Sequence, residues 1–293
     1  MGAFAQLVVD GLAMGAVYGA LALAIVLVHQ STGVVNFAQG GLAVLSGYFA
    51  YTFLGLNVPL LLAILLSVAI SFIMGALIER FIIRRFEGGD MHTTVVVTVG
   101  LLTLATGIAG WLWSYNNLRL PSLFPPDFFR VLGVSISWRS FGTFIVIIAI
   151  MVLLQLLFQK TRIGLALRAV ADNPRSAAFS GLPVERLLMV GWGLAAALGA
   201  VAGVLVAPRL TLTPGMMDGP LVYALAAVIL GGISSPVGVV VAASLIGILE
   251  NLAAVYLPFI GHDLKIAVPF LLLFAVLLIR PEGLFGRKSV ERV

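Results

Sequence analysis

The sequence of 293 residues contains no cysteine, and only 10% of its residues are charged. Without cysteine the chain forms no disulfide, thiolate metal site or thiol nucleophile. The scarcity of charge, together with a hydrophobic fraction of 61%, excludes a water-soluble globular protein, because too few polar residues remain to cover one apolar core. Most of the chain must therefore lie in lipid.

Motifs that would carry chemistry are also missing. The sequence has no HExxH zinc motif and no glycine-rich ATP-binding loop ending in Gly-Lys-Ser/Thr, and His29, His92 and His262 lie far apart. No two carboxylates stand at helical spacing within an apolar run. An enzyme needs acids, bases or metal ligands gathered in one place. We therefore expect no catalytic residues, no metal and no cofactor on this chain.

Apolar runs recur along the whole sequence, and most approach the length that crosses a lipid layer of roughly 30 Å as a helix. The run 219–233 is short, and helix-breaking residues in GGISSPVG follow it, so a re-entrant pair in 219–256 is an alternative to two spans. The expected fold class is all-α, a polytopic integral membrane protein of about 8–9 transmembrane or re-entrant helices, some broken at glycine. The predicted spans are residues 5–28, 35–54, 58–79, 93–114, 140–159, 187–208, 219–233, 237–256 and 264–280.

The distribution of basic residues predicts the orientation of the chain. The loops 80–92 and 160–186 and the tail from Arg280 hold 12 of the 17 lysines and arginines, and the alternation of nine spans puts all three on one side. By the positive-inside rule this side is cytoplasmic, so the N-terminus is expected outside and the C-terminus in the cytoplasm. Residues 1–293 are expected to form one transmembrane domain. Both halves share a glycine-rich texture, which leaves an internal duplication open although no alignable repeat is visible.

Small residues form ridges on two of the predicted helices. Gly11, Gly15 and Gly19 stand four apart in the first span, and Gly199 and Gly203 repeat that spacing in the sixth. Helices in lipid associate by close backbone approach along such ridges. These glycines are expected to pack helices within the subunit, and a seam between two subunits is the alternative.

Polar residues interrupt the apolar sequence at the start of the second span. In GVVNFAQGGLAVLSGY, Asn36 and Gln39 stand three apart and precede Gly40. Two residues at this spacing share one helix face and can bond to exposed carbonyls. They either join the first two spans or line the transport pathway. The ionisable residues near spans are Asp10, Glu79, Asp218 and Glu250, and all are expected near helix ends, in reach of interfacial water.

The loop 160–186 contains a short helix. In ADNPRSAAFSGLPVERLL, Asn173 is suited to cap a helix whose first residue is Pro174, and Gly181 supplies a left-handed stop. The pattern predicts a helix over residues 174–180, too short to cross a membrane. It either decorates the loop or docks into a groove of a partner through a small-residue face at Ala177 and Ala178.

Three stretches resemble permeases of the branched-chain amino-acid family of ABC importers. Residues 11–51 resemble the start of these permeases, where a glycine-rich first helix leads to an Asn-Phe-Ala-His/Gln-Gly motif. Residues 167–208 resemble the cytoplasmic loop and the helix that follows it, and residues 227–250 resemble the late glycine-rich segment. The short N-terminus is similar to that of the first of two paired permeases in such systems.

The resemblance implies a larger machine in a bacterial cytoplasmic membrane. Its expected partners are a second related permease, two cytoplasmic ATP-binding subunits that hold the ATP, and an extracytoplasmic solute-binding protein, with membrane lipid and no nucleic acid. In related importers a short permease helix seats on the ATPase, and the matching positions here are Pro174, Arg175, Ser176, Ala177, Ala178 and Gly181. Ser176 stands where the general importer motif has Glu, and Gln39 stands where many relatives have His.

The resemblance implies branched-chain amino acids as the substrate. Urea, short amides and other small solutes are alternatives within the same family. An ion-coupled secondary carrier or channel built on broken helices is an alternative from another class, and an intramembrane enzyme or a structural subunit is a third. Only the alternatives within the ABC importer family require separate ATPase subunits.

Overall fold

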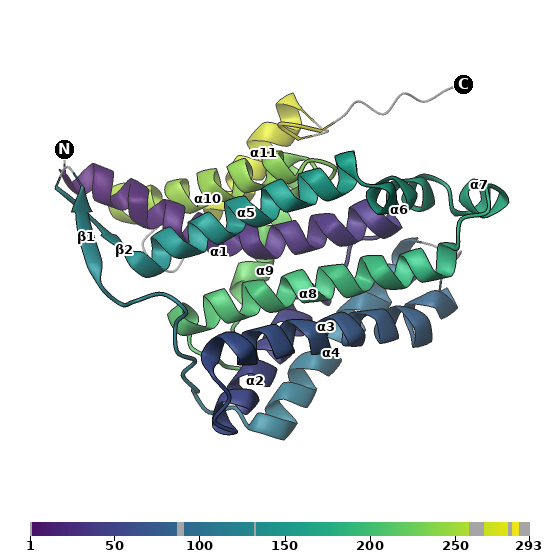
Figure 1. The fold of residues 1–293 in the computed structure, drawn as a ribbon. Helices are drawn as coiled ribbons and strands as arrows, with labels where there is room; N and C mark the ends of the chain where they lie inside the picture. Colours follow the sequence, from purple (N-terminus) through teal and green to yellow (C-terminus); the bar gives the residue numbers. More distant parts are fainter. Residues whose placement is uncertain (1, 87–90, 132, 258–266, 281–282, 287–293) are drawn as a thin grey trace. The chain divides into compact units, whose positions relative to one another are not determined.

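The computed structural model describes residues 2–86, 91–131, 133–257, 267–280 and 283–286. Nearly all of the elements in these ranges are helices (Figure 1). The N-terminal elements are α1 (Gly2–Thr32), α2 (Gln39–Gly55), α3 (Leu60–Phe81), the 3-10 helix η1 (Ile83–Phe86) and α4 (Met91–Trp113). The remaining elements are β1 (Phe128–Val131), β2 (Val134–Ser137), α5 (Trp138–Lys160), α6 (Arg162–Asp172), α7 (Pro174–Phe179), α8 (Val184–Leu210), α9 (Asp218–Gly231), α10 (Pro236–Tyr256) and α11 (Ala267–Ile279).

Each of the nine predicted spans coincides with one apolar helix, which confirms the all-α membrane class. Six helices in the described part of the chain are long and apolar enough to cross a membrane: α1, α3, α4, α5, α8 and α10. The helix α9 has 14 residues, so at about 1.5 Å per residue it reaches roughly 21 Å, less than the hydrocarbon layer. The beginning of the last predicted span, 264–266, lies outside the described residues.

The chain divides into two compact units. Unit 1 combines Met1–Val26, Phe124–Met151 and Val222–Val293, and unit 2 combines Leu27–Leu123 and Val152–Leu221. Three of the four boundaries fall inside helices, α1, α5 and α9, and the fourth lies between α4 and β1.

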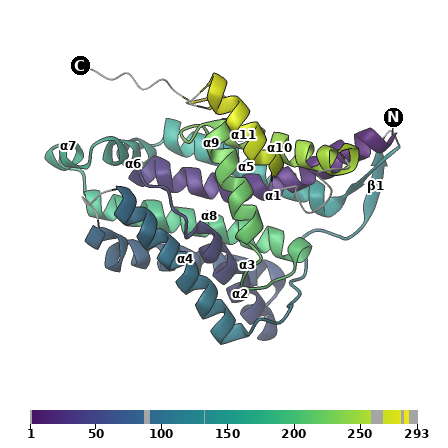
Figure 2. The same cartoon turned by 180° about the vertical axis from the view of Figure 1, so that it is seen from behind.

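Unit 2 is built around the antiparallel pair α3 and α8, which lie side by side in both views, with α2 against them (Figures 1 and 2). Glycine makes the pair possible. A Cβ added at Gly75 would stand 2.6 Å from the carbonyl oxygen of Trp192, and one added at Gly193 would stand 2.9 Å from the ring of Phe72. The two backbones therefore approach more closely than side chains would allow, as expected for helices packed in lipid.

Unit 1 contains a β-hairpin that the sequence analysis did not predict. Strands β1 and β2 pair antiparallel, with Phe128 opposite Ser137 and Val131 opposite Val134. Gly133, with φ +82°, supplies the positive φ that the tight connection needs. Aromatic and β-branched residues in FFRV and VSIS favour strands, and both stretches lie between the predicted spans 93–114 and 140–159.

The loop 160–186 contains two helices where only one was predicted. Before α7 lies α6, which begins after Thr161, whose hydroxyl oxygen accepts a 3.0 Å hydrogen bond from the Gly164 amide. One face of α6 is buried at Gly164, Leu167 and Val170. The amphipathic pattern of RIGLALRAVAD thus marked a helix that the turn signals around Pro174 did not reveal.

Candidate functional site

The short helix α7 begins at the predicted residue, Pro174, and ends at Phe179, one residue before the predicted end. The side chain of Asn173 accepts a hydrogen bond of 2.9 Å from the Ser176 amide, and Pro174 is the first helical residue. Gly181 follows with φ +80°, and α8 starts at Val184 directly after Pro183. The cap and the left-handed glycine fix α7 as a separate turn of helix between α6 and α8.

An apolar cluster joins α7 to its two neighbouring helices. Val170 of α6, Ala177 of α7 and Leu188 of α8 are buried together, and Leu182 and Leu187 pack against them. The docking alternative placed Ala177 on a face presented to a partner, and for this residue that placement is wrong, because only 5% of its surface is exposed. Because α6 and α8 cover this side of α7, Ala177 holds the loop together, while Ala178 remains exposed.

The outer face of α6 and α7 carries apolar side chains that nothing in the described chain covers. Phe179 is 92% exposed, and Leu165 and Ile163 of α6 are 61% and 54% exposed. Beside them lies an open groove of about 360 Å³ between the two helices. We call this face the α6–α7 surface; its groove is lined by Arg162, Leu165, Ala166, Ala169, Asn173, Ser176, Ala177, Ser180 and Leu182.

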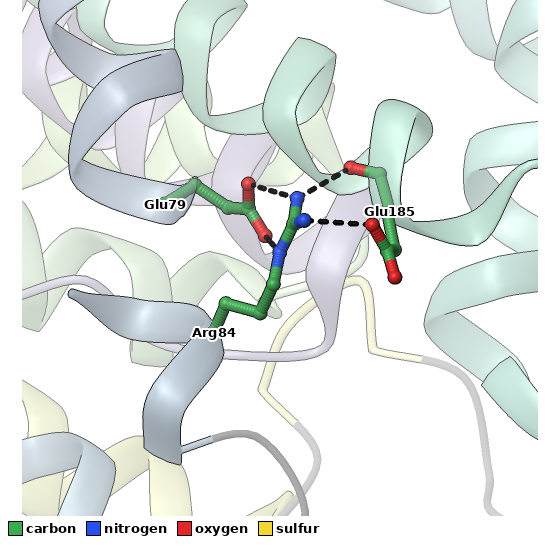
Figure 3. Close-up of polar contacts among 3 residues, drawn as sticks. All are labelled: Glu79, Arg84 and Glu185. Atoms are coloured by element: carbon green, nitrogen blue, oxygen red, sulfur yellow. Dashed lines mark hydrogen bonds and ion pairs between the residues drawn. The ribbon is translucent and has the colours of Figure 1, made fainter. Parts of the chain in front are cut away.

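An ion-pair cluster lies at the start of α8, next to this loop (Figure 3). The Arg84 guanidinium holds the Glu79 carboxylate through Nε at 3.2 Å and Nη2 at 2.9 Å. Its Nη1 donates to the Glu185 carboxylate at 2.8 Å, and Nη2 donates to the Glu185 backbone carbonyl at 3.2 Å. The cluster brings η1 from the basic loop 80–92 and α8 from the end of the basic loop 160–186 to one end of unit 2.

Glu79 was expected to reach interfacial water from a helix end, and that expectation is wrong. Its side chain is fully buried, with 0% exposure. The chain turns back after α3, so that Arg84 covers the carboxylate and neutralises it. Sequence spacing places Arg84 near Glu79, but Glu185 lies 101 positions further along, and no local pattern announces that contact.

The polar residues at the start of α2 form a buried junction with α8. Asn36 lies before the helix, where its side-chain oxygen accepts from the Ala38 amide at 2.9 Å and its nitrogen donates to Gln39 at 3.2 Å. Gln39 in turn donates to the Ala195 carbonyl at 2.8 Å. Gly40 faces Leu221, the nearest atom to an added Cβ being 3.2 Å away. A role of these residues in the pathway stays a prediction.

The predicted glycine ridges both face helices of this chain. In unit 1, a Cβ added at Gly11 or Gly15 would stand 2.6–2.7 Å from the backbone of α10, whereas one added at Gly19 meets only side chains, at 3.6 Å or more. In unit 2, Gly199 lies against the Gln39 side chain and Gly203 against the Ala43 carbonyl. Close backbone approach is thus required at three of the five positions, Gly11, Gly15 and Gly203, whereas the close neighbour of Gly199 is the Gln39 side-chain amide.

A second carboxylate is buried in unit 1. Glu250 of α10 is 8% exposed and accepts a hydrogen bond of 2.8 Å from the Tyr18 hydroxyl. The Tyr18 ring stacks on Tyr223, with 4.5 Å between ring centroids. Asp10, in contrast, is exposed, and its carboxylate accepts a 3.2 Å hydrogen bond from the side-chain amide of Gln6. Glu250 is therefore buried between packed helices, whereas the sequence analysis expected it within reach of interfacial water.

Comparison with known proteins identifies the family. Residues 7–277 match the family described as branched-chain amino acid transport system / permease component. The chain is 29% identical to the high-affinity branched-chain amino acid transport system permease protein BraD of Pseudomonas aeruginosa, over 99% of this chain and 98% of that protein. It is 28% identical to the corresponding permease protein LivH of Escherichia coli K12, with the same coverage.

A solved structure, PsaBC from Streptococcus pneumoniae in complex with Fab, has a TM-score of 0.47 at 18% identity, covering 94% of this chain and 91% of that one. That likeness is too low to bear on function. The family match extends over nearly the whole chain and includes every described helix that is long enough to cross a membrane. The chain therefore belongs to the branched-chain amino acid transport system permease family.

Proposed function

We propose that this chain forms half of the translocation pathway of an ABC importer for branched-chain amino acids. A second, related permease forms the other half. Two cytoplasmic subunits bind and hydrolyse ATP, so this chain needs no cofactor, and an extracytoplasmic binding protein delivers the solute. The names of the relatives, both of them branched-chain amino acid permeases, support this substrate class.

The single observation that carries the coupling role is the α6–α7 surface. A phenylalanine exposed over 92% of its surface at the tip of a capped helix costs free energy in water, because about 25 cal/mol is lost for each Å² of exposed apolar area. Burial against a partner recovers that free energy, and a groove beside a protruding aromatic anchor suits a protein interface. We assign Phe179 as the anchor that inserts into the ATPase subunit.

The orientation of the chain supports an ATPase as that partner. The basic loops 80–92 and 160–186 meet through Arg84 and Glu185 at one end of unit 2. By the positive-inside rule this end faces the cytoplasm, where ATP is available. The N-terminus then lies outside and the C-terminus in the cytoplasm. ATP binding moves the ATPase surface, α7 follows it, and the permease shifts between outward-open and inward-open states.

The test is ATP-driven uptake of leucine by the complete complex in proteoliposomes. Phe179→Ala and Ala178→Trp change the exposed face of α7 without touching its buried Ala177. Both variants are expected to insert normally, to lose most ATPase subunits on purification and to lose uptake. Phe4→Ala, at a residue of unit 1 that is 52% exposed near the start of α1, is the matched control and is expected to retain both.

Two results contradict the proposal. Retention of the ATPase subunits and of uptake by Phe179→Ala removes the assignment of the α6–α7 surface. Leucine flux by the purified chain alone under an ion gradient, with no ATPase subunit, identifies a secondary carrier instead.

A further inference from the structure

The cluster of Glu79, Arg84 and Glu185 joins the end of α3 to the start of α8, the helix that follows the α6–α7 surface in the chain. We infer that Arg84 is a positioning residue of transport: it makes α3 follow α7, so that movement of the partner reaches the membrane part of the permease. This inference rests on the proposed docking of α7 to an ATPase subunit and adds the route by which that docking acts.

The first step of the route is apolar and short. Ala177 of α7 is buried against Val170 and Leu188, and Leu182, in the connection to α8, packs on the same cluster. The connection itself is tight, because the Leu182 amide donates to the Ala177 carbonyl at 3.1 Å and the Val184 amide to the Leu182 carbonyl at 2.9 Å. A displacement of α7 must therefore move the first turns of α8.

The second step is the ion-pair cluster. Glu185 is the second residue of α8, and Arg84 binds both its carboxylate and its backbone carbonyl. The same guanidinium holds the buried Glu79 of α3 with two hydrogen bonds. Because the planar guanidinium makes two hydrogen bonds to each glutamate, it fixes both the distance and the relative orientation of Glu79 and Glu185. A single hydrogen bond to each would not fix the orientation.

The degree of burial distinguishes the two ion pairs of Arg84. The pair with Glu79 matters for packing, and the pair with Glu185 matters for transmitting movement. The Glu79 side chain is 0% exposed, that of Arg84 is 25% exposed and that of Glu185 is 76% exposed. An exposed ion pair adds little to folding stability. The ion pair of Arg84 with Glu185 is therefore expected to affect the coupling of transport to ATP hydrolysis while contributing little to the free energy of unfolding. The two effects can be measured separately.

The last step is the packing of α3 on α8. Beyond the cluster, Gly75 lies against Trp192 and Ala196, and Phe72 lies against Gly193. Packing this close transmits displacement because interiors at this density deform little. With the cluster intact the pair is fixed at both its cytoplasmic end and its middle. Without it, the first turns of α8 can move while α3 stays in place.

The variants that test this route remove either both ion pairs of Arg84 or only the one with Glu185. Arg84→Gln removes both ion pairs. Glu185→Gln removes only the charge of the exposed carboxylate and leaves the buried pair of Arg84 and Glu79 in place. Arg85 is the matched control, because it is the adjacent arginine, is exposed and forms no ion pair among the described residues. Thermal unfolding of each purified complex gives its stability.

The primary measurement is the number of leucine molecules taken up per ATP hydrolysed by the complete complex. We expect Arg84→Gln to lower this ratio about tenfold and Glu185→Gln about threefold, with ATP hydrolysis within twofold of the parent and Arg85→Gln unchanged. A parallel loss of uptake and hydrolysis, or an unchanged ratio, overturns the inference.

A second measurement is independent of the substrate and of the ATPase. The chain has no cysteine, so cysteines introduced at Asp172 of α6 and Leu77 of α3 are unique sites for spin labels. In the isolated permease, the distance distribution between them is expected to be narrow for the parent and for Arg85→Gln, and broad for Arg84→Gln. Equal widths overturn the inference, whereas a parent complex that takes up no leucine overturns the proposed function instead.

Discussion

The side-chain amide of Gln39 donates a hydrogen bond of 2.8 Å to the backbone carbonyl of Ala195, and so ties the start of α2 to the middle of α8. Asn36 completes the junction by donating to the other side of the same amide. Both residues are fully buried. Their hydrogen-bonding groups are directed at one another and at protein backbone, but the helix that Gln39 binds is α8, whereas the structural alternative from the sequence had them join the first two spans.

Replacing Gln39 by Leu is expected to destabilise the protein. The change removes the bond to Ala195 and leaves the Asn36 amide without its acceptor, at a cost of about 1–3 kcal/mol. The midpoint of thermal unfolding in detergent measures this loss. Gln159→Leu, at an exposed glutamine near the end of α5, is the control and should leave the midpoint unchanged. An unaltered midpoint for Gln39→Leu together with altered uptake would instead place this side chain in the transport pathway.

The glycine ridge of α1 gives a prediction in which two neighbouring glycines behave oppositely. A Cβ at Gly15 would stand 2.7 Å from both the Ala243 carbonyl oxygen and the Ser244 Cα, so Gly15→Ala must separate α1 from α10 and should cost about 1–3 kcal/mol. A Cβ at Gly19 meets its nearest atom at 3.6 Å, an ordinary contact. Gly19→Ala should therefore be neutral, or stabilising by up to about 1 kcal/mol through helix propensity. Thermal unfolding compares them, and equal midpoints would contradict the packing assigned to Gly15.

The sequence was sufficient for the features that depend on one segment at a time. Span positions follow from the length of apolar runs, and all nine correspond to helices because lipid leaves helix as the way to satisfy the backbone of such a run. The cap at Asn173 and the left-handed Gly181 are equally local, since their partners lie within a few residues.

The features that depend on distant partners were not predictable. The outward or inward direction of Ala177 is decided by α8, which covers one side of α7. The turn after α3 places Arg84 over the buried Glu79, and the further contact of Arg84 with Glu185 has no signal in the sequence. The α6 helix could have been found from its amphipathic pattern, because its buried residues stand three apart.

The buried pair of Tyr18 and Glu250 provides a test of how a carboxylate is held within the packing of unit 1. Glu250→Leu leaves the Tyr18 hydroxyl without its acceptor, which should cost about 1–3 kcal/mol. Glu250→Gln keeps an acceptor oxygen and should cost less. Adding Tyr18→Phe to Glu250→Leu should recover part of the loss, because the donor of the lost hydrogen bond is then removed as well. A double-mutant cycle of thermal unfolding measures the coupling, and strictly additive losses would contradict the hydrogen bond.

The hairpin of unit 1 is held by one side chain from the first helix. Gln6 accepts from the Ser135 amide at 2.9 Å and donates to the Ser135 carbonyl at 3.0 Å, so it binds both backbone groups of one β2 residue. Gln6→Leu should release the strand, since a two-stranded hairpin is marginal by itself. Amide hydrogen exchange over residues 134–137 is expected to accelerate about fivefold, which corresponds to roughly 1 kcal/mol. Asp10→Asn, which alters only the exposed contact of the same glutamine, should leave exchange unchanged, and equal acceleration in both variants would assign the effect to the helix end and not to the bond with Ser135.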